Sequence, residues 1–234
     1  MTASKIDPDG APKFYGRRKG RPLRAGRLSL VETLLPTLTI PTDRPDLDPV
    51  TLFDAPVEKV WLEVGFGGGE HLAALAERHP EIGFLGCEPF INGVAKLLSA
   101  VDEGGLTNVR ILADDARLLM AALRPASLDR VFVLFPDPWP KRRHWARRFI
   151  GPENLPELAR ILRPGGELRI ATDHPGYLDW ILAHMTRSRD FDWLAERSSD
   201  WLNRPDDWQP TRYERKSLAG RPHYLRFLRR PDRD

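Results

Sequence analysis

The fold is decided by the stretch VEKVWLEVGFGGGE at residues 57–70. Its first half, Val57 to Val64, is an apolar-rich run typical of a buried strand, and the glycines that follow allow a tight turn whose backbone can approach a ligand closely. Glu70 stands where the dinucleotide-binding fingerprint has its last Gly or Ala, and its carboxylate would oppose a pyrophosphate at the helix N-terminus. The stretch therefore predicts a strand, a ligand-binding turn and a helix, with a ligand that lacks phosphate.

The same alternation of strand-like and helix-like segments continues along the chain. Apolar runs that predict strands occupy residues 57–64, 82–87, 109–113, 131–135, 167–171 and 223–228. Apolar residues repeat at helical spacing in 91–101 and 155–162, and Gly165-Gly166 is a stop signal after the second of these. This alternation predicts an α/β fold with a Rossmann-like, doubly wound sheet whose central strands are parallel.

Residues 1–50 differ in composition from the rest of the 234-residue chain. They are rich in Pro, Gly, Arg and Asp, show little periodicity, and hold eight Lys or Arg against two Asp in the first 30 positions. We expect a flexible basic arm and linker at 1–50 and one folded domain at 51–234, with the folded core beginning near Val57.

The charged residues are unevenly distributed. The total of 36 Lys and Arg against 33 Asp and Glu gives a formal net charge of only +3, but basic residues gather in the arm, in 141–148 and in 204–233. Three such patches on one face would form a surface for a phosphate backbone, which is the usual electrostatic footprint of nucleic-acid binding. An ordinary solvated surface is the alternative interpretation of any one patch.

Cysteine and histidine usage argues against disulfide and metal chemistry. The single cysteine, Cys87, lies in an apolar stretch, which predicts a buried, inert thiol and excludes a disulfide within the chain. The six histidines show no metal-ligand spacing, and we expect His71 on a helix surface and His79 at a helix end. We therefore expect no metal cofactor.

No apolar run reaches membrane-spanning length, and Glu32 and Pro36 interrupt the stretch 28–40, which lacks the uninterrupted core of a signal peptide. These features predict a cytoplasmic protein without membrane association. Nothing in the sequence indicates an obligatory protein partner.

Acidic residues stand at or directly after five successive predicted strands. They are Glu63, Glu88, Asp114, Asp115, Asp137 and Asp173. Because the carboxyl ends of parallel strands meet at one edge of a sheet, we expect these carboxylates to face a common ligand, although Asp115 and Asp173 can also serve as helix N-caps. Glu88 lies where an acid after the second strand binds ribose hydroxyls. S-adenosylmethionine has a ribose, an adenine amine, an ammonium and a sulfonium but no phosphate, and it fits this edge better than a nicotinamide cofactor does.

The segment FPDPWPKRRHWARR at 135–148 places an acid-bearing turn directly before a run of cations interleaved with aromatic rings. Prolines on both sides of Asp137 restrict the backbone that carries it, so its carboxylate has few alternative directions. We expect a catalytic turn followed by a polyanion-binding segment, with a plain surface loop as the alternative. Trp139 and Trp145 are candidates for stacking on an exposed base, and packing in the core is an equal alternative for Trp139.

Six ordered motifs resemble those of the bacterial single-chain tRNA (guanine-N7-)-methyltransferases. They are EVGFGGG at 63–69, Cys87-Glu88, Asp115-Ala116, FPDPWPK at 135–141, ATD at 171–173 and TRYE at 211–214. The resemblance spans residues 57–229, Arg17 to Arg27 is similar to that family's basic arm, and Pro140 stands where many relatives carry a polar or basic residue. It implies a class I S-adenosylmethionine-dependent methyltransferase with an antiparallel last strand, which methylates N7 of guanine 46 in the variable loop of tRNA.

The resemblance also implies roles for individual residues. The implied S-adenosylmethionine-binding residues are Glu63, Gly65, Gly67, Glu88, Asp115 and Asp137, and Asp137 is also the implied catalytic residue. The implied substrate-binding residues are Lys141, Asp173, Thr211, Arg212, Tyr213 and Glu214, although spacing alone predicts a surface turn for 211–214. The implied RNA-binding residues are Arg143, His144, Trp145, Arg147 and Arg148, with Arg17, Arg18, Lys19 and Arg21 of the arm.

Three other functions remain open from the residues themselves. One is an amino-group methyltransferase acting on another RNA, since a proline-framed acid beside an aromatic ring also suits an exocyclic amine. The second is a nicotinamide-dependent oxidoreductase, which Glu70 disfavours. The third is a non-catalytic RNA-binding module. The strand-end acids argue against it, because their carboxylates would repel phosphate.

Overall fold

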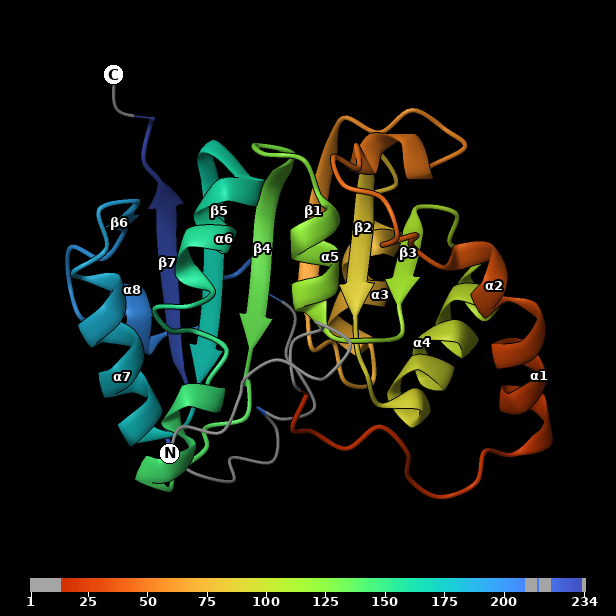
Figure 1. Ribbon diagram of the computed structural model, residues 1–234, viewed down its shortest axis with the longest axis horizontal. Helices are drawn as coiled ribbons and strands as arrows, with labels where there is room; N and C mark the ends of the chain where they lie inside the picture. The colour runs from red at the N-terminus through yellow and green to blue at the C-terminus, as the bar shows by residue number, and fades with distance from the viewer. Residues whose placement is uncertain (1–13, 209–213, 215–219, 233–234) are drawn as a thin grey trace.

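A seven-stranded sheet forms the centre of the computed structural model, which describes residues 14–208, 214 and 220–232 (Figure 1). Its strand order is β3-β2-β1-β4-β5-β7-β6. The strands are β1 (Lys59–Val64), β2 (Ile82–Cys87), β3 (Val109–Leu112), β4 (Leu128–Leu134), β5 (Leu162–Thr172), β6 (Phe191–Trp193) and β7 (His223–Arg229). The three-residue β6, which the sequence pattern did not predict, forms one edge.

Strands β1 to β5 run parallel, and their register brings their carboxyl ends to one edge. Val64 of β1 pairs with Cys87 of β2 and with Val133 of β4, and Cys87 pairs with Leu112 of β3. Strand β7 is antiparallel to β5, and β6 is antiparallel to β7. The expected doubly wound, mostly parallel sheet with an antiparallel last strand is therefore confirmed, although β5 begins five residues earlier than its apolar run.

Helices cover both faces of this sheet (Figure 1). They are α1 (Ala25–Thr33), α2 (Leu35–Leu38), α3 (Glu70–Arg78), α4 (Ile91–Gly104), α5 (Ala116–Ala122), α6 (Leu155–Ile161), α7 (Pro175–Met185) and α8 (Ser199–Leu202), with 3-10 turns η1 (Pro49–Leu52) and η2 (Arg142–Arg147). Two apolar clusters result: one buries α5, α6 and α7 side chains, and the other buries those of α3 and α4. Burial on both faces explains why the central strands are continuous apolar runs.

The expectation that the folded core begins near Val57 is wrong. Leu30, Val31, Leu34 and Leu35 pack against the cluster under α3 and α4, and Ile40 is 1% exposed, with its N–H donating to Ile111 O at 3.0 Å. These four residues have amphipathic helical spacing, which Glu32 and Pro36 obscured; Pro36 lies in the first turn of α2, where a proline is tolerated. The division of the chain at residue 50 stays a prediction.

Cys87 ends β2 in the core and is 1% exposed, which confirms the expected buried thiol. Burial raises the pKa of this thiol well above its usual value, and the carboxylates of Asp115 and Glu88 raise it further. The thiol is therefore unreactive and lies in a region of negative potential. Among the described residues, no helix is both long and apolar enough to cross a membrane.

Candidate active site

A cleft of about 790 Å³ opens at the carboxyl ends of β1, β2 and β4. Four of the six strand-end acids line it: Glu63, Glu88, Asp115 and Asp137. The expected convergence of carboxylates thus holds for these four. Asp114 and Asp173 follow β3 and β5 but do not belong to the lining.

The glycine turn after β1 forms one wall of the cleft. Gly65 and Gly67 have φ values of 68° and 57°, a left-handed conformation that side chains disfavour. A Cβ on Gly93 of α4 would lie 2.0 Å from Gly67 O, so the turn packs directly on the helix backbone. The turn is therefore fixed in place and presents its backbone to the cleft.

Glu88 closes this turn from the end of β2. Its carboxylate accepts hydrogen bonds from Gly67 N at 2.8 Å and from Phe90 N at 2.9 Å. Burial raises the pKa of Glu88, against the lowering effect of these two bonds, and the charges of Asp137 and Glu63 raise it further. The carboxylate is rigidly aimed and keeps acceptor capacity for a ligand.

His71 is a site residue that the sequence placed wrongly on a helix surface. It is 3% exposed, lines the cleft, and its Nδ1 lies 2.8 Å from Oε2 of Glu63, itself 5% exposed. It is the second residue of α3 and lies on the buried face of that helix. The spacing of His71 with the buried Leu72, Leu75 and Ala76 was the available signal.

Asp115 lines the cleft and also caps the N-terminus of α5. Its side chain accepts from Arg117 N at 3.0 Å as the N-cap of α5, as expected, and it pairs with the Arg117 guanidinium. Asp114 instead binds Arg18 of the arm at 2.8 Å. Asp173 is not the N-cap of α7, because His174 takes that place and accepts from Tyr177 N at 3.2 Å.

The turn that carries Asp137 has an unusual backbone. Phe135 and Trp139 have φ values of 50° and 43°, a conformation uncommon for residues other than glycine. Phe135 N still donates to Ala171 O at 2.8 Å, which ties the turn to β5. The Asp137 side chain is open to the cleft, yet the surrounding walls bury it enough to raise the pKa of its carboxyl group.

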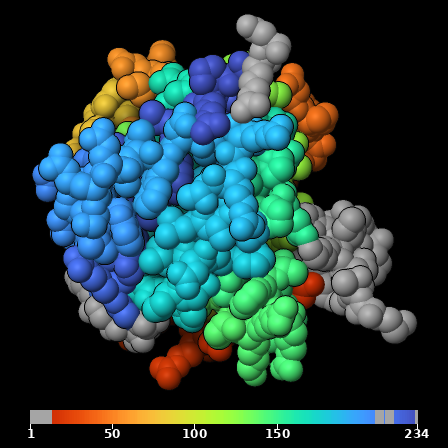
Figure 2. Space-filling view, turned by 90° about the vertical axis from the view of Figure 1, so that its left-hand side faces the viewer, coloured from red at the N-terminus to blue at the C-terminus, as the bar shows by residue number. Residues whose placement is uncertain are grey.

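The basic segment η2 follows this turn and projects from the lower edge of the molecule (Figure 2). Lys141 and Arg143 are exposed, and His144 and Trp145 are half-buried. Trp139 is half-buried too, and it contacts His144 and Tyr15 edge to face. The Arg147 guanidinium lies 4.2 Å from the Tyr15 ring centroid and 5.1 Å from that of Trp139.

Arg148 differs from its neighbours in this segment. Only 5% of its surface is exposed, and its Nε donates to Pro138 O at 2.8 Å. Its guanidinium lies about 5 Å from the rings of Trp145, Tyr177 and Trp180. Burial lowers the pKa of Arg148 from its usual value.

The arm contributes to the cleft, which the sequence did not indicate. Arg17 and Arg21 line it, whereas Arg18 and Lys19 are exposed outside the lining. Figure 1 shows this segment passing beneath the strand ends toward α1. Arg18 O accepts from Ile91 N at 3.0 Å; Gly20 N donates to Asn92 Oδ1, and Asn92 Nδ2 donates to Arg21 O, so the arm is fastened to the start of α4.

Of the motif TRYE, Thr211, Arg212 and Tyr213 lie outside the described residues. Glu214 accepts from Tyr224 Oη at 2.5 Å and from Arg204 Nη1 at 2.9 Å. The hydroxyl of Tyr224 therefore fixes one end of the motif to β7.

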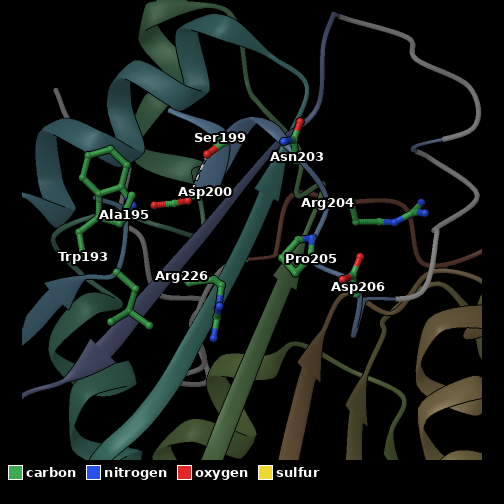
Figure 3. Close-up of a pocket in the computed structure, with 10 residues that line it drawn as sticks. Trp193, Ala195, Ser199, Asp200, Asn203, Arg204, Pro205, Asp206 and Arg226 are labelled. Atoms are coloured by element: carbon green, nitrogen blue, oxygen red, sulfur yellow. Dashed lines mark hydrogen bonds between the residues drawn. The ribbon is translucent and has the colours of Figure 1, made fainter. Parts of the chain in front are cut away.

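A second concavity of about 280 Å³ lies between α8, the segment after it and β7 (Figure 3). Three of its charged side chains already have partners: Arg204 binds Glu214, Arg226 binds Glu167, and Asp200 accepts from two backbone N–H groups. Within the described part of the chain, no group of three or more His, Cys, Asp or Glu could hold a metal ion. The large acidic cleft is thus the candidate active site.

The fold and the cleft define a class I S-adenosylmethionine-dependent methyltransferase. Solved structures agree on the fold: an rRNA methylase from Streptococcus thermophilus is 15% identical with a TM-score of 0.52, covering 86% of this chain and 96% of that one. A 16S rRNA methyltransferase is 18% identical with a TM-score of 0.51, covering 75% and 89%.

Sequence relatives give the family. Residues 57–224 match the family model described as "Putative methyltransferase". The tRNA (guanine-N(7)-)-methyltransferase of Rhodospirillum rubrum is 53% identical over 96% of this chain and 90% of its own length, and that of Nitrobacter hamburgensis is 49% identical over 99% and 92%. The chain belongs to the tRNA (guanine-N(7)-)-methyltransferase family.

Proposed function

We propose that the protein transfers a methyl group from S-adenosylmethionine to N7 of a guanine in tRNA, at guanine 46 of the variable loop. The observation that carries the proposal is the position of Asp137, which lies on the turn between the acidic cleft and the basic η2 segment. A cofactor on one side and an RNA backbone on the other would meet at this residue. Because the substrate is tRNA, the proposal locates the enzyme in the cytoplasm.

The cleft residues fit S-adenosylmethionine by charge and by hydrogen-bonding capacity. Burial is the main cause of the raised pKa of Cys87, and the charges of Asp115 and Glu88 raise it further; these carboxylates suit a cationic ligand without phosphate. In the proposal, Glu88 accepts from the ribose hydroxyls, Glu63 from the ammonium group, and Asp115 from the adenine amine, while Gly65 and Gly67 allow close backbone approach. When bound, the cofactor supplies an electrophilic methyl group on a sulfonium.

Asp137 would orient the base rather than remove a proton. Guanine N7 is an acceptor that carries a lone pair and no proton, so methylation there requires no strong general base. Alignment of that lone pair with the methyl carbon is a positioning task, which is worth several kcal/mol in well-oriented reactions, up to about 7–11. We propose that the Asp137 carboxylate accepts from the donors on the Watson–Crick edge of guanine and stabilises the positive charge that develops on the ring.

The basic surface would hold the RNA. Arg143 and Lys19 are exposed, and Arg147 lines the cleft. Lys141, Asp173 and the 211–214 motif remain proposed substrate contacts. Phosphate contacts from Arg143, Lys19 and Arg147 would offset the cost of turning out a base held in tertiary structure, about a few kcal/mol.

The test is incubation with labelled S-adenosylmethionine and unmodified bulk tRNA, followed by nucleoside analysis by mass spectrometry. We expect N7-methylguanosine, and mapping of the label to the variable loop. A methyl group on an exocyclic amine would instead support the amino-group alternative. No transfer to tRNA would refute the proposal.

A further inference from the structure

Arg148 is the last cation of a run that the sequence assigns as a whole to RNA, but its side chain points into the protein. It is 5% exposed, whereas Arg143 of the same run is exposed. Arg148 lines the cleft, but because so little of it is exposed, a phosphate group approaching the outer surface would meet Arg143 and not the guanidinium of Arg148. Its position therefore requires an explanation other than phosphate binding.

Three aromatic rings hold this guanidinium in place. The rings of Trp145, Tyr177 and Trp180 have centroids 4.9, 5.1 and 5.1 Å from its central carbon, within the range of cation–π attraction. Two of the rings are fixed by hydrogen bonds to one residue: Ile150 N donates to Tyr177 Oη at 3.0 Å, and Trp180 Nε1 donates to Ile150 O at 2.7 Å. The guanidinium is thus fastened to α7.

From this fixed position Arg148 reaches the turn that carries Asp137. Its Nε donates to the carbonyl oxygen of Pro138, the residue directly after Asp137, at 2.8 Å. Its Nη1 is buried without a hydrogen-bond partner in the described part of the chain, and the bond from Nε ties the side chain to the turn.

The turn needs such a tie, because its backbone adopts a rarely observed conformation on both sides of Asp137. Phe135 and Trp139 have positive φ values, and backbone of this kind persists where surrounding structure determines it. Phe135 N, bound to Ala171 O, fixes the beginning of the turn. The Pro138 carbonyl lies on the other side of Asp137, between it and Trp139.

We infer that Arg148 is a positioning residue. It is fixed against α7 and binds the Pro138 carbonyl, so that the Asp137 carboxylate stays directed into the cleft. Arg148 acts through the backbone of the turn, with the aromatic rings fixing its direction. The inference rests on the proposed function, because it assigns Asp137 its part in methyl transfer.

Steady-state kinetics separate positioning from phosphate binding. We expect Arg148→Met and Arg148→Lys to lower kcat by about 10- to 100-fold, the scale of a misplaced reacting group, while KM for tRNA and its dependence on salt stay within about twofold of the wild type. Lysine keeps the charge but lacks the planar group and the Nε donor, so it should not restore turnover. The comparison variant Arg143→Met should instead raise KM for tRNA and reduce the salt slope by about one.

A double-mutant cycle tests whether Arg148 works through Asp137. If it does, Arg148→Lys should lower the residual turnover of Asp137→Asn far less than that of the wild type. Thermal unfolding and calorimetric S-adenosylmethionine binding check that each variant is folded, and if Arg148→Met is not, Arg148→Lys carries the test. Near-normal kcat in Arg148→Lys, a raised KM with a reduced salt slope, or additive effects in the cycle would overturn the inference. A wild-type enzyme without tRNA methylation would mean that the proposed function fails.

Discussion

Glu63 and His71 form a buried pair at the cleft, with Oε2 and Nδ1 2.8 Å apart. The carboxylate comes from the end of β1 and the imidazole from the first turn of α3, so the pair bridges the two sides of the glycine turn. The His71 ring also packs edge to face on Phe132 of β4, at 5.0 Å between ring centroids. These contacts fix the direction of a carboxylate that we propose binds the cofactor's ammonium group.

We expect His71→Leu to destabilise the protein and to weaken cofactor binding. Without the imidazole, Glu63 keeps its burial but loses this hydrogen bond, which costs about 1–3 kcal/mol. Urea unfolding and calorimetry with S-adenosylmethionine measure the two effects. His79→Leu is the matched control, because its bond to Glu81 is exposed and worth about 0–1 kcal/mol. Equal losses in both variants would contradict the assignment.

We expect Asp137→Asn to keep the fold and to lose most turnover, by about 10²- to 10³-fold, the loss typical of removing one preorganised stabilising group. The amide replaces an acceptor with a group that also presents donors to the base. Single-turnover methylation of tRNA measures the loss. Asp54→Asn is the control: Asp54 is exposed, pairs with Arg110 and does not line the cleft. Near-normal turnover in Asp137→Asn would contradict the proposed role of Asp137 in orienting the base.

The pH dependence of stability should change in the same variant. Burial raises the pKa of Asp137, so between its unfolded and folded pKa values the folded state binds more protons than the unfolded state. Stability contributed by this group is therefore lost as pH rises through that window. We expect Asp137→Asn to be more stable than the wild type at pH 7 and to lose this advantage at pH values below the unfolded pKa, about 3.9. Urea unfolding across a range of pH measures this difference in stability. A difference that does not change with pH would argue against the raised pKa of Asp137 as its cause.

Turnover should show the complementary trend. If the ionised Asp137 orients the base, the rate falls as pH drops through its raised pKa, so the acid limb of kcat should lie above the usual aspartate range of about 3.9. The raised pKa of Glu88 acts in the same direction, and Glu88→Gln separates the two carboxylates. An acid limb at or below the ordinary aspartate value would contradict this expectation.

The sequence predicted the sheet well because burial on both faces makes the central strands rich in apolar residues, most clearly β2 and the second half of β4. It predicted the cleft acids because parallel strands end at one edge. It missed contacts that depend on side-chain direction: His71 was expected on a helix surface and faces Glu63, and Arg148, grouped with surface cations, is buried. For His71 the spacing with Leu72, Leu75 and Ala76 was a signal of burial. For Arg148 there was no such signal, because the other cations of the run are exposed or half-buried and the rings of Tyr177 and Trp180 that pack around it come from a distant segment.

Removal of the arm should weaken cofactor binding as well as RNA binding. From the sequence alone, deletion of residues 1–27 is expected mainly to raise the RNA concentration needed and to leave cofactor binding intact. The structure changes that expectation, since Arg17 and Arg21 line the cleft and the arm is hydrogen-bonded to Ile91 and Asn92 at the start of α4. Deletion of residues 1–24 should raise both KM for tRNA and Kd for S-adenosylmethionine, the latter on the order of tenfold, the equivalent of about one net hydrogen bond. Deletion of residues 1–13 keeps these contacts and should leave Kd for the cofactor near the wild-type value. Equal cofactor affinity in both truncations would show that the arm serves RNA alone.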